Sequence, residues 1–313
     1  MPKVEILLIA PLTDADHVAL DRDFTVHRLW PQDDKDAFIA SVAQNIRAVV
    51  TRGDFGASAK LIASLPKLEI IACFGVGTDA IDLPAARARS IPVTITPDIL
   101  TDDVADIGMA LMLGILRNVV AGDRHVRTLK WPDGPLPLTV GLKGKRLGIY
   151  GLGKIGMALA TRAAAFGMPI AYHSRKPRRD AAYPFHTSLV ELAKASDILA
   201  VCASATAETQ GTVNAAVLEA LGPKGYLINV SRGSVVDEPA LLTALEQRTI
   251  AGAGLDVFLN EPRIDARFMA LDNVMLQPHQ GSGTFETRAG MGQLVRDNLA
   301  AHFAGKPPLT PVG

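Results

Sequence analysis

The chain has 313 residues, of which 48% are hydrophobic, so it is long enough for two medium domains that each have their own core. Lys plus Arg and Asp plus Glu number 32 each, which excludes a global field that steers the protein toward nucleic acid or an acidic membrane. The first twelve residues lack a small-residue cleavage site, and the longest apolar segment, from Val104, is too short to span a bilayer. We therefore expect a soluble cytoplasmic protein with no nucleic-acid or membrane partner.

The first third of the chain alternates apolar runs with helical segments, a pattern typical of parallel sheets covered on both faces. The expected strands are VEILLIA, AVVTR, LEIIACF and PVTI. Gly75 and Gly77 follow the third run in G-x-G-x-x-A spacing, but no helix begins directly after them. Free backbone N–H groups in this loop would suit a small carboxylate, and an ordinary glycine turn is the alternative.

The segment 99–122 is apolar nearly all round and predicts one buried helix, with Thr101 as its N-cap and two Asp residues in its first turn. The loop 131–144 that follows has three prolines and three glycines, which exclude regular structure. Cys73 and Cys202 lie in apolar runs far apart in the sequence. They offer neither a disulfide framework nor zinc-ligand spacing, so we expect two core residues and no metal site.

A second series of six strands follows, which is the number in a complete dinucleotide-binding sheet. They are KRLGIYG, PIAYHS, DILAVC, GYLINV, AGAGLD and NVMLQP. The C-terminal helix, from about residue 287 to residue 303, has no third domain to join, so we place it against the first domain. The predicted fold is α/β, with two Rossmann-like or flavodoxin-like parallel-sheet domains and an active-site cleft between them. The predicted domains are residues 1–98 plus 287–313 for the substrate and residues 99–286 for the dinucleotide.

The first strand of this second series leads into IYGLGKIGMALA, where Gly151, Gly153 and Gly156 have G-x-G-x-x-G spacing before an Ala-rich helix. The first glycine permits a tight turn, the second lets the backbone approach a pyrophosphate, and the third lets the helix pack on the strand. The pyrophosphate would then lie on the N–H groups of the helix N-terminus. A tight turn without a ligand is the alternative.

The second strand of this series lacks the Asp or Glu that normally binds the ribose 2′-hydroxyl of NAD. It ends instead in Ser174, Arg175 and Lys176, which offer a hydroxyl, a planar guanidinium fork and a point charge. This set suits a 2′-phosphate, so we expect NADP(H) in preference to NAD(H). A solvated charge run is the alternative, and it leaves the missing acid unexplained. Arg178 and Arg179 are expected to be ordinary surface residues.

Three ionisable residues follow late strands of the series, at the carboxyl edge where α/β sheets bind ligands. They are Arg232, Glu261 and His279. Hydride transfer to a carbonyl needs a proton donor, which an imidazolium supplies, and a neighbouring carboxylate would stabilise that charged form. An Arg would bind the substrate carboxylate bidentately. Each residue alone could be a surface or loop residue, but their combination behind a dinucleotide motif predicts a dehydrogenase.

The chain resembles the D-isomer-specific 2-hydroxyacid dehydrogenase family over essentially its whole length. Within it, the chain is most similar to the NADPH-preferring glyoxylate/hydroxypyruvate reductases. The similar stretches include TPDILTDDVADIGMALML, GKRLGIYGLGKIGMALATRAAAFGMPIAYHSR, LINVSRGSVVDE, AGLDVF and QPHQGSGTFETR. The resemblance implies a homodimer in which the long helix from Asp102 forms the interface, and a small 2-oxo or 2-hydroxy acid as the substrate.

The resemblance also implies roles for individual residues. Arg232 would bind the substrate, His279 would be the acid/base and Glu261 would pair with it; Val76 and Gly77 would grip the substrate carboxylate with backbone N–H groups, and Asp256 would hold the nicotinamide carboxamide. The cofactor contacts implied are Gly151, Leu152, Gly153, Lys154, Ile155, Gly156, Ser174, Arg175, Lys176, Val104, Thr209, Val230 and Asp256.

Other positions depart from the family pattern or have an open role. Ser204 stands where the family usually has a proline, and Gln280 follows the His where Ile, Val or Thr is common. Trp131 would reach the neighbouring subunit's site as in some relatives, or be a packed loop aromatic. Arg52 faces the predicted cleft and would set substrate size, with a structural ion pair as the alternative.

The predicted function is the NADPH-dependent reduction of glyoxylate or hydroxypyruvate to glycolate or D-glycerate. A larger 2-oxo acid, such as a sugar acid or phenylpyruvate, is the alternative substrate, and a nicotinamide-responsive corepressor is the alternative class of protein. A phosphorylated substrate is less favoured because the first domain shows no second basic cluster in the sequence.

Overall fold

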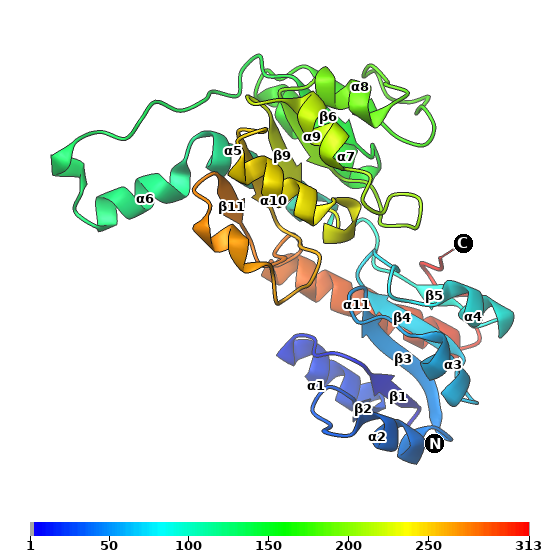
Figure 1. The fold of residues 1–313 in the computed structure, drawn as a ribbon. Coiled ribbons are helices and arrows are strands. Elements are labelled where there is room, and N and C mark those ends of the chain that lie inside the picture. The colour runs from blue at the N-terminus through cyan, green and yellow to red at the C-terminus, as the bar shows by residue number, and fades with distance from the viewer. Residues whose placement is uncertain (1–2, 313) are drawn as a thin grey trace. The chain divides into compact units, whose positions relative to one another are not determined.

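The computed structural model describes residues 3–312, which form two compact α/β units. Unit 1 comprises Met1–Leu100 and Thr284–Gly313, and unit 2 comprises Thr101–Gly283. Each unit has its own parallel sheet (Figure 1), which confirms the predicted fold class. The cleft between the two domains stays a prediction.

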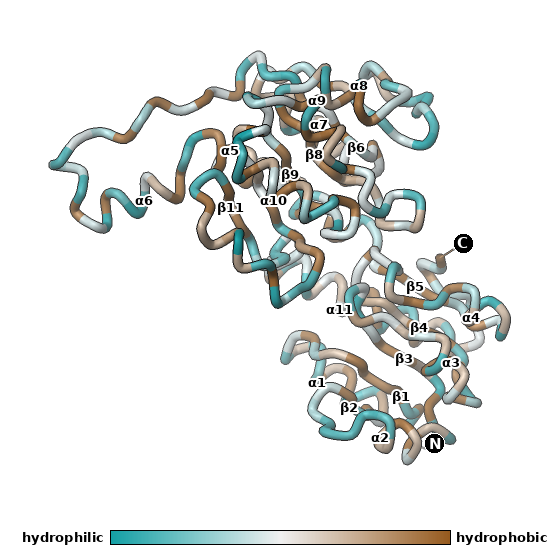
Figure 2. The backbone as a smooth tube through the Cα atoms, viewed as in Figure 1, coloured by the Kyte–Doolittle hydropathy of each residue, from teal (hydrophilic) through white to brown (hydrophobic). Residues whose placement is uncertain are grey.

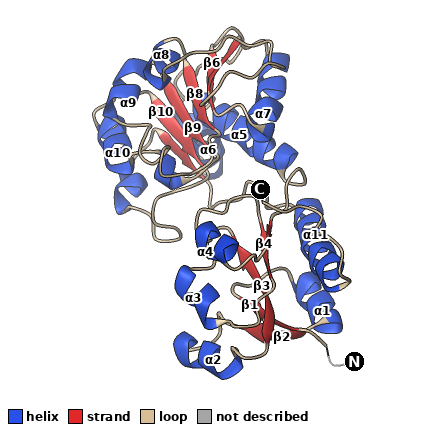
Figure 3. Cartoon of the chain, turned by 90° about the vertical axis from the view of Figure 1, so that its right-hand side faces the viewer, coloured by secondary structure: helices blue, strands red, loops and turns tan. Residues whose placement is uncertain are grey.

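Unit 1 is built on a five-stranded parallel sheet with helices on both faces. Its strands are β1 (Glu5–Leu8), β2 (Thr25–Arg28), β3 (Ile46–Arg52), β4 (Ile70–Phe74) and β5 (Val93–Thr94), and its helices are α1 (Asp14–Asp23), α2 (Lys35–Val42), α3 (Ala59–Ser64), α4 (Leu83–Ala88) and α11 (Phe285–Phe303). Helices α1 and α11 cover one face, and α2, α3 and α4 cover the other (Figure 3). The strand order is β2-β1-β3-β4-β5.

One strand of unit 1, β2, was not expected from the sequence. Strand β2 pairs with β1 at the edge of the sheet, and none of its four residues is buried. It is polar and short because an edge strand has only one neighbour and little core to cover. Helix α1 begins after Thr13, whose side chain accepts a hydrogen bond from the Asp16 N–H as an N-cap.

Unit 2 contains the six predicted strands in one parallel sheet. They are β6 (Leu147–Tyr150), β7 (Ile170–His173), β8 (Ile198–Val201), β9 (Tyr226–Asn229), β10 (Gly252–Leu255) and β11 (Val274–Leu276), and the helices are α5 (Thr101–Leu116), α6 (Val119–Arg127), α7 (Lys154–Ala165), α8 (Leu189–Lys194), α9 (Ala215–Leu221) and α10 (Glu238–Glu246). Figure 3 shows α8, α9 and α10 on one face and α5 and α7 on the other. Figure 2 shows hydrophobic residues concentrated along the strands, as expected for a sheet covered on both faces.

The expected single helix over residues 99–122 is wrong in two respects. Thr101 is the first residue of α5 rather than a cap before it. The helix ends at Leu116, because Asn118 adopts a left-handed conformation with φ of 52°, and α6 begins at Val119. Helix α5 is buried against α7 and the strands β9, β10 and β11, whereas α6 has no buried residue.

No single helix within residues 3–312 has the length and hydropathy needed to cross a bilayer. The bent pair α5 and α6 reaches that length and hydropathy only when the two helices are taken together.

Each sheet has one point at which the order of successive strands reverses, so that the chain continues on the other side of its first strand. In unit 1 the chain passes from β1 to β2 on one side and to β3 on the other, and in unit 2 it passes likewise from β6 to β7 and then to β8. Parallel α/β sheets bind ligands at the carboxyl ends of the strands at such a switch point. Two edges of the molecule are therefore expected to bind ligands, one in each unit.

Candidate active site

The glycine loop after β6 has the geometry that each glycine of the motif requires. Gly151 has φ of 94°, and a Cβ there would lie 2.5 Å from the Ala203 backbone. A Cβ on Gly156 would lie 2.3 Å from the Gly151 carbonyl oxygen, so this glycine lets α7 pack on β6. A Cβ on Gly153 would meet no atom within 4 Å. The open side of Gly153 is where a pyrophosphate would approach the backbone.

Helix α7 begins directly after this loop, with Gly153 as its N-cap and no side-chain cap. The N–H groups of a first turn have no partner within the helix and carry the positive end of its dipole. Lys154, Ile155 and Gly156 form that turn. The loop and helix together fit the phosphates of a dinucleotide.

The segment after β7 holds the glycine loop through hydrogen bonds to both backbone polar groups of Leu152. The Leu152 N–H donates to Ser174 Oγ at 3.1 Å, and Arg178 Nη1 donates to the Leu152 carbonyl oxygen at 3.0 Å. Arg178 also pairs with Asp180 at 2.5 Å, and its backbone N–H donates to the Tyr172 hydroxyl at 2.8 Å. The expectation of an ordinary surface residue is therefore wrong for Arg178, which anchors the loop. No sequence pattern predicts this contact, because Arg178 follows β7 whereas Leu152 follows β6.

A cavity of about 910 Å³ opens beside the glycine loop, at the switch point between β6 and β8. Seven of the predicted cofactor residues line it, namely Gly151, Leu152, Gly153, Ser174, Arg175, Lys176 and Thr209. The other six do not, namely Lys154, Ile155, Gly156, Val104, Val230 and Asp256. Val104, Val230 and Asp256 are buried in unit 2.

The charged rim of this cavity contains an acid that the sequence analysis did not single out. Glu208 Oε2 lies 3.8 Å from Arg175 Nη1, and both side chains are exposed. Cys202 also lines the cavity and is half-buried rather than fully buried in the core, whereas Cys73 is buried as expected. Burial raises the pKa of the Cys202 thiol to about 12, so this thiol stays protonated.

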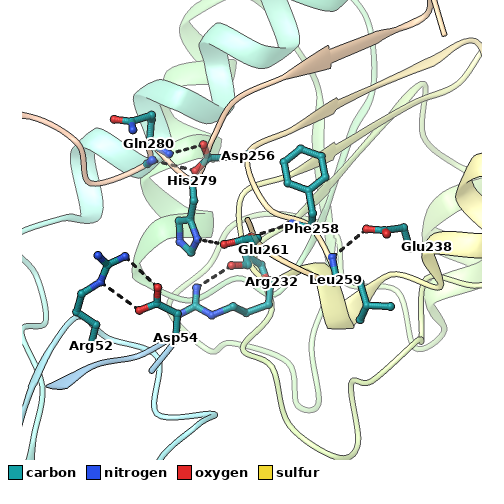
Figure 4. A network of polar contacts seen from close by, with 12 residues as sticks. Arg52, Asp54, Arg232, Glu238, Asp256, Phe258, Leu259, Glu261, His279 and Gln280 are labelled. Atoms are coloured by element: carbon teal, nitrogen blue, oxygen red, sulfur yellow. Dashed lines mark hydrogen bonds and ion pairs between the residues drawn. The ribbon is translucent and has the colours of Figure 1, made fainter. Parts of the chain in front are cut away.

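His279 and Glu261 form a close pair in unit 2, at the carboxyl ends of β11 and β10 (Figure 4). His279 Nδ1 lies 2.6 Å from Glu261 Oε2, and the other carboxylate oxygen accepts from the Phe258 N–H at 2.8 Å. Burial acts to raise the pKa of Glu261, but these two hydrogen bonds and the positive charges of His279 and Arg232 outweigh it and hold that pKa below its ordinary value. Glu261 is thus ionised and oriented toward the imidazole.

Asp256 holds the loop that carries His279. Its two carboxylate oxygens accept the N–H groups of Gln280 and Gly281 at 2.7 and 2.8 Å, and its carbonyl oxygen accepts from the His279 N–H at 2.9 Å (Figure 4). His279 has φ of 56°, a conformation that a histidine keeps only where its surroundings impose it. Burial raises the pKa of Asp256 despite these bonds. The carboxamide contact predicted for Asp256 stays a prediction.

Arg232 follows β9 and lies in the same unit as the His279–Glu261 pair. Its Nη1 donates to the Ser231 carbonyl oxygen at 2.8 Å, and its own carbonyl oxygen accepts from Asn229 Nδ2 at 3.0 Å. The next residue, Gly233, touches the Phe258 backbone so closely that a Cβ there would lie 1.9 Å from it. Glycine therefore lets the Arg232 turn approach the loop that ends in Glu261.

Glu238 is a further residue of this network that the sequence analysis did not select. It lies in the first turn of α10, is buried, and accepts the Leu259 N–H at 2.9 Å (Figure 4). The loop 257–262 is thus held by two carboxylates, Glu238 and Glu261. The stretch SRGSVVDE contains both Arg232 and Glu238, so the sequence could have suggested that Glu238 lies near the site.

The second glycine loop lies in unit 1 after β4. Gly75 has φ of 149°, and its N–H donates to Thr96 Oγ1 at 3.0 Å. The next two N–H groups, those of Val76 and Gly77, donate to no acceptor within the described part of the chain, and both residues are half-buried. No helix begins until α4, as expected. Two adjacent free N–H groups are a suitable cradle for a carboxylate.

Arg52, at the end of β3, forms a two-bond ion pair with Asp54 at 3.2 and 2.9 Å (Figure 4). It also lines a cavity of about 210 Å³ in unit 1, together with Arg288 of α11. The sequence of the first domain shows no second basic cluster, but the fold brings these two arginines to one cavity. The two arginines come from β3 and from the C-terminal helix, so no run of basic residues marks them in the sequence.

Trp131 begins a short 3₁₀ turn after α6, Trp131–Asp133, so the expectation that the loop 131–144 has no regular structure was wrong for these three residues and holds for the others. Its side chain is 66% exposed, so within its own chain it is not the packed loop aromatic that was the alternative. Its reach into a neighbouring subunit stays a prediction. Within residues 3–312, no group of three His, Cys, Asp or Glu side chains is placed to hold a metal ion.

Comparison with known proteins agrees with this geometry. The model of the D-isomer specific 2-hydroxyacid dehydrogenase NAD binding domain matches residues 109–281. The chain is 48% identical to hydroxyphenylpyruvate reductase of Plectranthus scutellarioides and 45% identical to glyoxylate/hydroxypyruvate reductase A of Arabidopsis thaliana, and each alignment covers 100% of both chains.

Among solved structures, the chain is similar to the NADPH-dependent glyoxylate/hydroxypyruvate reductase of Sinorhizobium meliloti in complex with NADP and malonate. The TM-score is 0.94 at 43% identity, and the match covers 99% of this chain and 97% of that one. These relatives support the reduction of a 2-oxo acid with a nicotinamide cofactor. The chain therefore belongs to the D-isomer specific 2-hydroxyacid dehydrogenase family.

Proposed function

We propose that the protein reduces glyoxylate or hydroxypyruvate to glycolate or D-glycerate, with NADPH as the cofactor. The observation that carries the proposal is the 2.6 Å pair of His279 and an ionised Glu261 at the carboxyl edge of a dinucleotide-binding sheet. A bound nicotinamide would supply the hydride, and the protein would supply the proton, the substrate contacts and the orientation.

His279 is the proposed proton donor. Its Nδ1 faces Glu261, which leaves Nε2 as the nitrogen that holds the proton for the carbonyl oxygen of the substrate. The carboxylate of Glu261 orients the imidazole through its contact with Nδ1, and the backbone bonds of Asp256 keep the His279 loop in place. Asp256 and Glu238 are therefore positioning residues in this proposal.

Arg232 is the proposed contact to the substrate carboxylate and carbonyl oxygen. A guanidinium binds a carboxylate through two parallel hydrogen bonds and also stabilises negative charge that develops on the carbonyl oxygen. The free N–H groups of Val76 and Gly77 would bind the same carboxylate. Together these groups would orient C2 of the substrate for hydride transfer.

The preference for NADPH rests on Ser174, Arg175 and Lys176, which line the cavity beside the glycine loop. No carboxylate follows β7 at the position that would bind a ribose 2′-hydroxyl. The pair between Arg175 and Glu208 is long and exposed, so Arg175 can turn to a phosphate at little cost. The similar reductase of Sinorhizobium meliloti is NADPH-dependent.

A homodimer is proposed on the apolar surface of α6 and the loop after it. Figure 1 shows this segment extending away from the sheet of unit 2. Seven of its large hydrophobic side chains are more than a third exposed, namely Val119, Val120, Val126, Leu129, Trp131, Leu136 and Leu138. So much exposed apolar surface marks a protein interface. The interface in this proposal lies on α6 rather than on α5, which is buried within its own unit.

A larger aromatic 2-oxo acid is the second candidate substrate, because the chain is 48% identical to a hydroxyphenylpyruvate reductase. Steady-state kcat/KM with NADPH distinguishes the candidates, with glyoxylate, hydroxypyruvate and hydroxyphenylpyruvate as substrates. The proposal predicts the highest kcat/KM for one of the two short acids. A preference for hydroxyphenylpyruvate by more than about ten-fold would replace the proposed substrate with the aromatic one.

A further inference from the structure

The small cavity of unit 1 lies at the switch point of its sheet, where a ligand is expected. It is lined by residues 11–13, which follow β1, and by Arg52 and Phe74, the last residues of β3 and β4. These are the carboxyl ends of the strands on both sides of the reversal in strand order. Phe74 directly precedes the glycine loop proposed to bind the substrate carboxylate. The cavity and that loop therefore share one edge of the sheet.

Arg288 also lines this cavity, and within residues 3–312 its guanidinium has no hydrogen-bond acceptor. In the same described part of the chain the guanidinium forms no ion pair, and the one direct contact described for it is with the ring of Phe74, whose centre lies 5.5 Å from the guanidinium carbon. Burial, followed by the charge of Arg52, lowers the pKa of Arg288, and Asp54 opposes this only in part. A half-buried cation with five unused donors is costly unless a ligand supplies an anion.

The charge of the cavity limits which anion it suits. Arg52 is neutralised by its two-bond pair with Asp54, so the Arg52, Asp54 and Arg288 side chains together carry one positive charge. A stacking contact also holds Arg52, whose guanidinium carbon lies 5.5 Å from the centre of the Phe55 ring. One net positive charge on a planar fork matches a carboxylate better than a doubly charged phosphate.

We propose that this cavity binds the second carboxylate of a 2-oxo dicarboxylic acid, which makes Arg288 and Arg52 specificity-determining residues. The inference rests on the proposed function, because the first carboxylate and the carbonyl use the same groups as before. Hydride from the reduced nicotinamide forms the C–H bond at C2, the C=O π electrons move to oxygen, and the His279 proton ends on that oxygen. The second carboxylate is unchanged by the reaction.

Matched substrate pairs test this proposal. Steady-state kcat/KM with NADPH is measured for 2-oxoglutarate against 2-oxopentanoate and for oxaloacetate against 2-oxobutanoate, which differ only in the terminal group. The dicarboxylate is expected to be favoured by roughly ten- to a hundred-fold, which is the effect of one charged hydrogen bond. Glyoxylate is measured alongside as the substrate that needs no second carboxylate site.

Two variants are expected to change this preference in opposite directions. Arg288→Gln removes the unpaired charge and should lower the dicarboxylate to monocarboxylate ratio by a similar factor. Asp54→Asn raises the net charge of the cavity and should raise the ratio. Arg22→Gln removes an exposed arginine of α1 that pairs with Asp23, and it should leave the ratio unchanged. If Arg288→Gln fails to fold, the Asp54→Asn result decides, and an unchanged ratio there overturns the proposal.

The remaining outcomes separate this inference from the proposed function. Turnover of glyoxylate with equal kcat/KM for the two members of each pair overturns the dicarboxylate site and leaves the proposed function standing. No turnover of any 2-oxo acid overturns both. If the phosphate ester of hydroxypyruvate exceeds both dicarboxylates by more than about ten-fold, the cavity is a phosphate site and the carboxylate assignment is wrong.

Discussion

The His279 imidazole and the Glu261 carboxylate are joined through Nδ1 and Oε2 at 2.6 Å, and backbone hydrogen bonds hold the loops on both sides of this pair. The pKa of Glu261 lies below its ordinary value because hydrogen bonds and nearby positive charge outweigh its burial. The Glu261 carboxylate is therefore charged at neutral pH. This relationship underlies the first two predictions.

Glu261→Gln keeps a hydrogen-bond acceptor beside His279 but removes the negative charge. His279 Nδ1 then loses its charged hydrogen-bond partner, so the imidazole is held less firmly and kcat/KM for glyoxylate should fall by about ten- to a hundred-fold, the effect of one charged hydrogen bond. Steady-state kcat/KM for glyoxylate is the measurement, with Glu246→Gln as a control on an exposed acid of the same unit. Equal kcat/KM for the wild type and Glu261→Gln would refute the assigned role.

The same variant has a second expected effect, on stability. Because the folded-state pKa of Glu261 is lowered, its contribution is present above the ordinary value of 4.5 and is lost as pH falls through the folded value. The wild type should thus be more stable than Glu261→Gln at neutral pH, with a difference that shrinks in acid. Urea unfolding at several pH values measures it. A difference that grows as pH falls would contradict the assignment.

His279→Ala should reduce kcat by about 10²- to 10⁴-fold, the typical contribution of a general acid. Cofactor binding should persist, because the glycine loop and its cavity lie after other strands. The measurements are kcat with glyoxylate and the Kd of NADPH from fluorescence titration. His186→Ala, a change of a half-buried histidine outside the proposed site, is the control. Parental turnover by His279→Ala would remove this residue from the mechanism.

Arg175→Ala and Arg178→Ala should affect the cofactors differently. Loss of a phosphate contact at Arg175 should weaken NADPH by about 1.5–3 kcal/mol and leave NADH nearly unchanged. Loss of the Arg178 bond to Leu152 should weaken both cofactors, since it loosens the glycine loop itself. Arg179→Ala, on the same exposed segment, serves as the control. An equal loss of NADPH and NADH binding in Arg175→Ala would argue against a 2′-phosphate contact.

Gly153→Ala and Gly156→Ala should separate cofactor binding from stability. A Cβ on Gly153 meets no atom within 4 Å, so this variant should fold normally and bind either cofactor more weakly, because the methyl group lies where the pyrophosphate approaches. A Cβ on Gly156 would lie 2.3 Å from the Gly151 carbonyl oxygen, so that variant should lose about 1–3 kcal/mol of stability. Thermal unfolding and Kd measurements distinguish the two. A stable Gly156→Ala would show that α7 can shift away from the loop.

The sequence was sufficient for much of unit 2. Four of its strands, β6, β8, β9 and β10, are almost wholly buried and read as apolar runs, and the glycine spacing has a geometric reason that the structure reproduces. The break between α5 and α6 was not predictable, because apolar residues continue across Asn118 and only its backbone conformation marks the break. Strand β2 was missed because an exposed edge strand carries no hydrophobic pattern.

Contacts between distant elements account for the rest. Arg288 comes from the C-terminal helix, yet it shares a cavity with the end of β3, and this proximity depends on the packing of α11 against β4. Likewise, Arg178 was dismissed as a surface residue because its bond is to a backbone carbonyl, which leaves no trace in side-chain patterns. The glycine loop could be placed from its motif, whereas the contacts of Arg178 and Arg288 could not, because each depends on residues that are distant in the sequence.

The most direct test of the central claim is a matrix of steady-state kcat/KM values, with NADPH and NADH against glyoxylate, hydroxypyruvate and a series of longer 2-oxo acids. The account predicts turnover of glyoxylate or hydroxypyruvate, with NADPH favoured over NADH by at least about ten-fold, the effect of one charged hydrogen bond to the 2′-phosphate. Negligible turnover of every 2-oxo acid with both cofactors, by a protein that still binds the nucleotide, would contradict it.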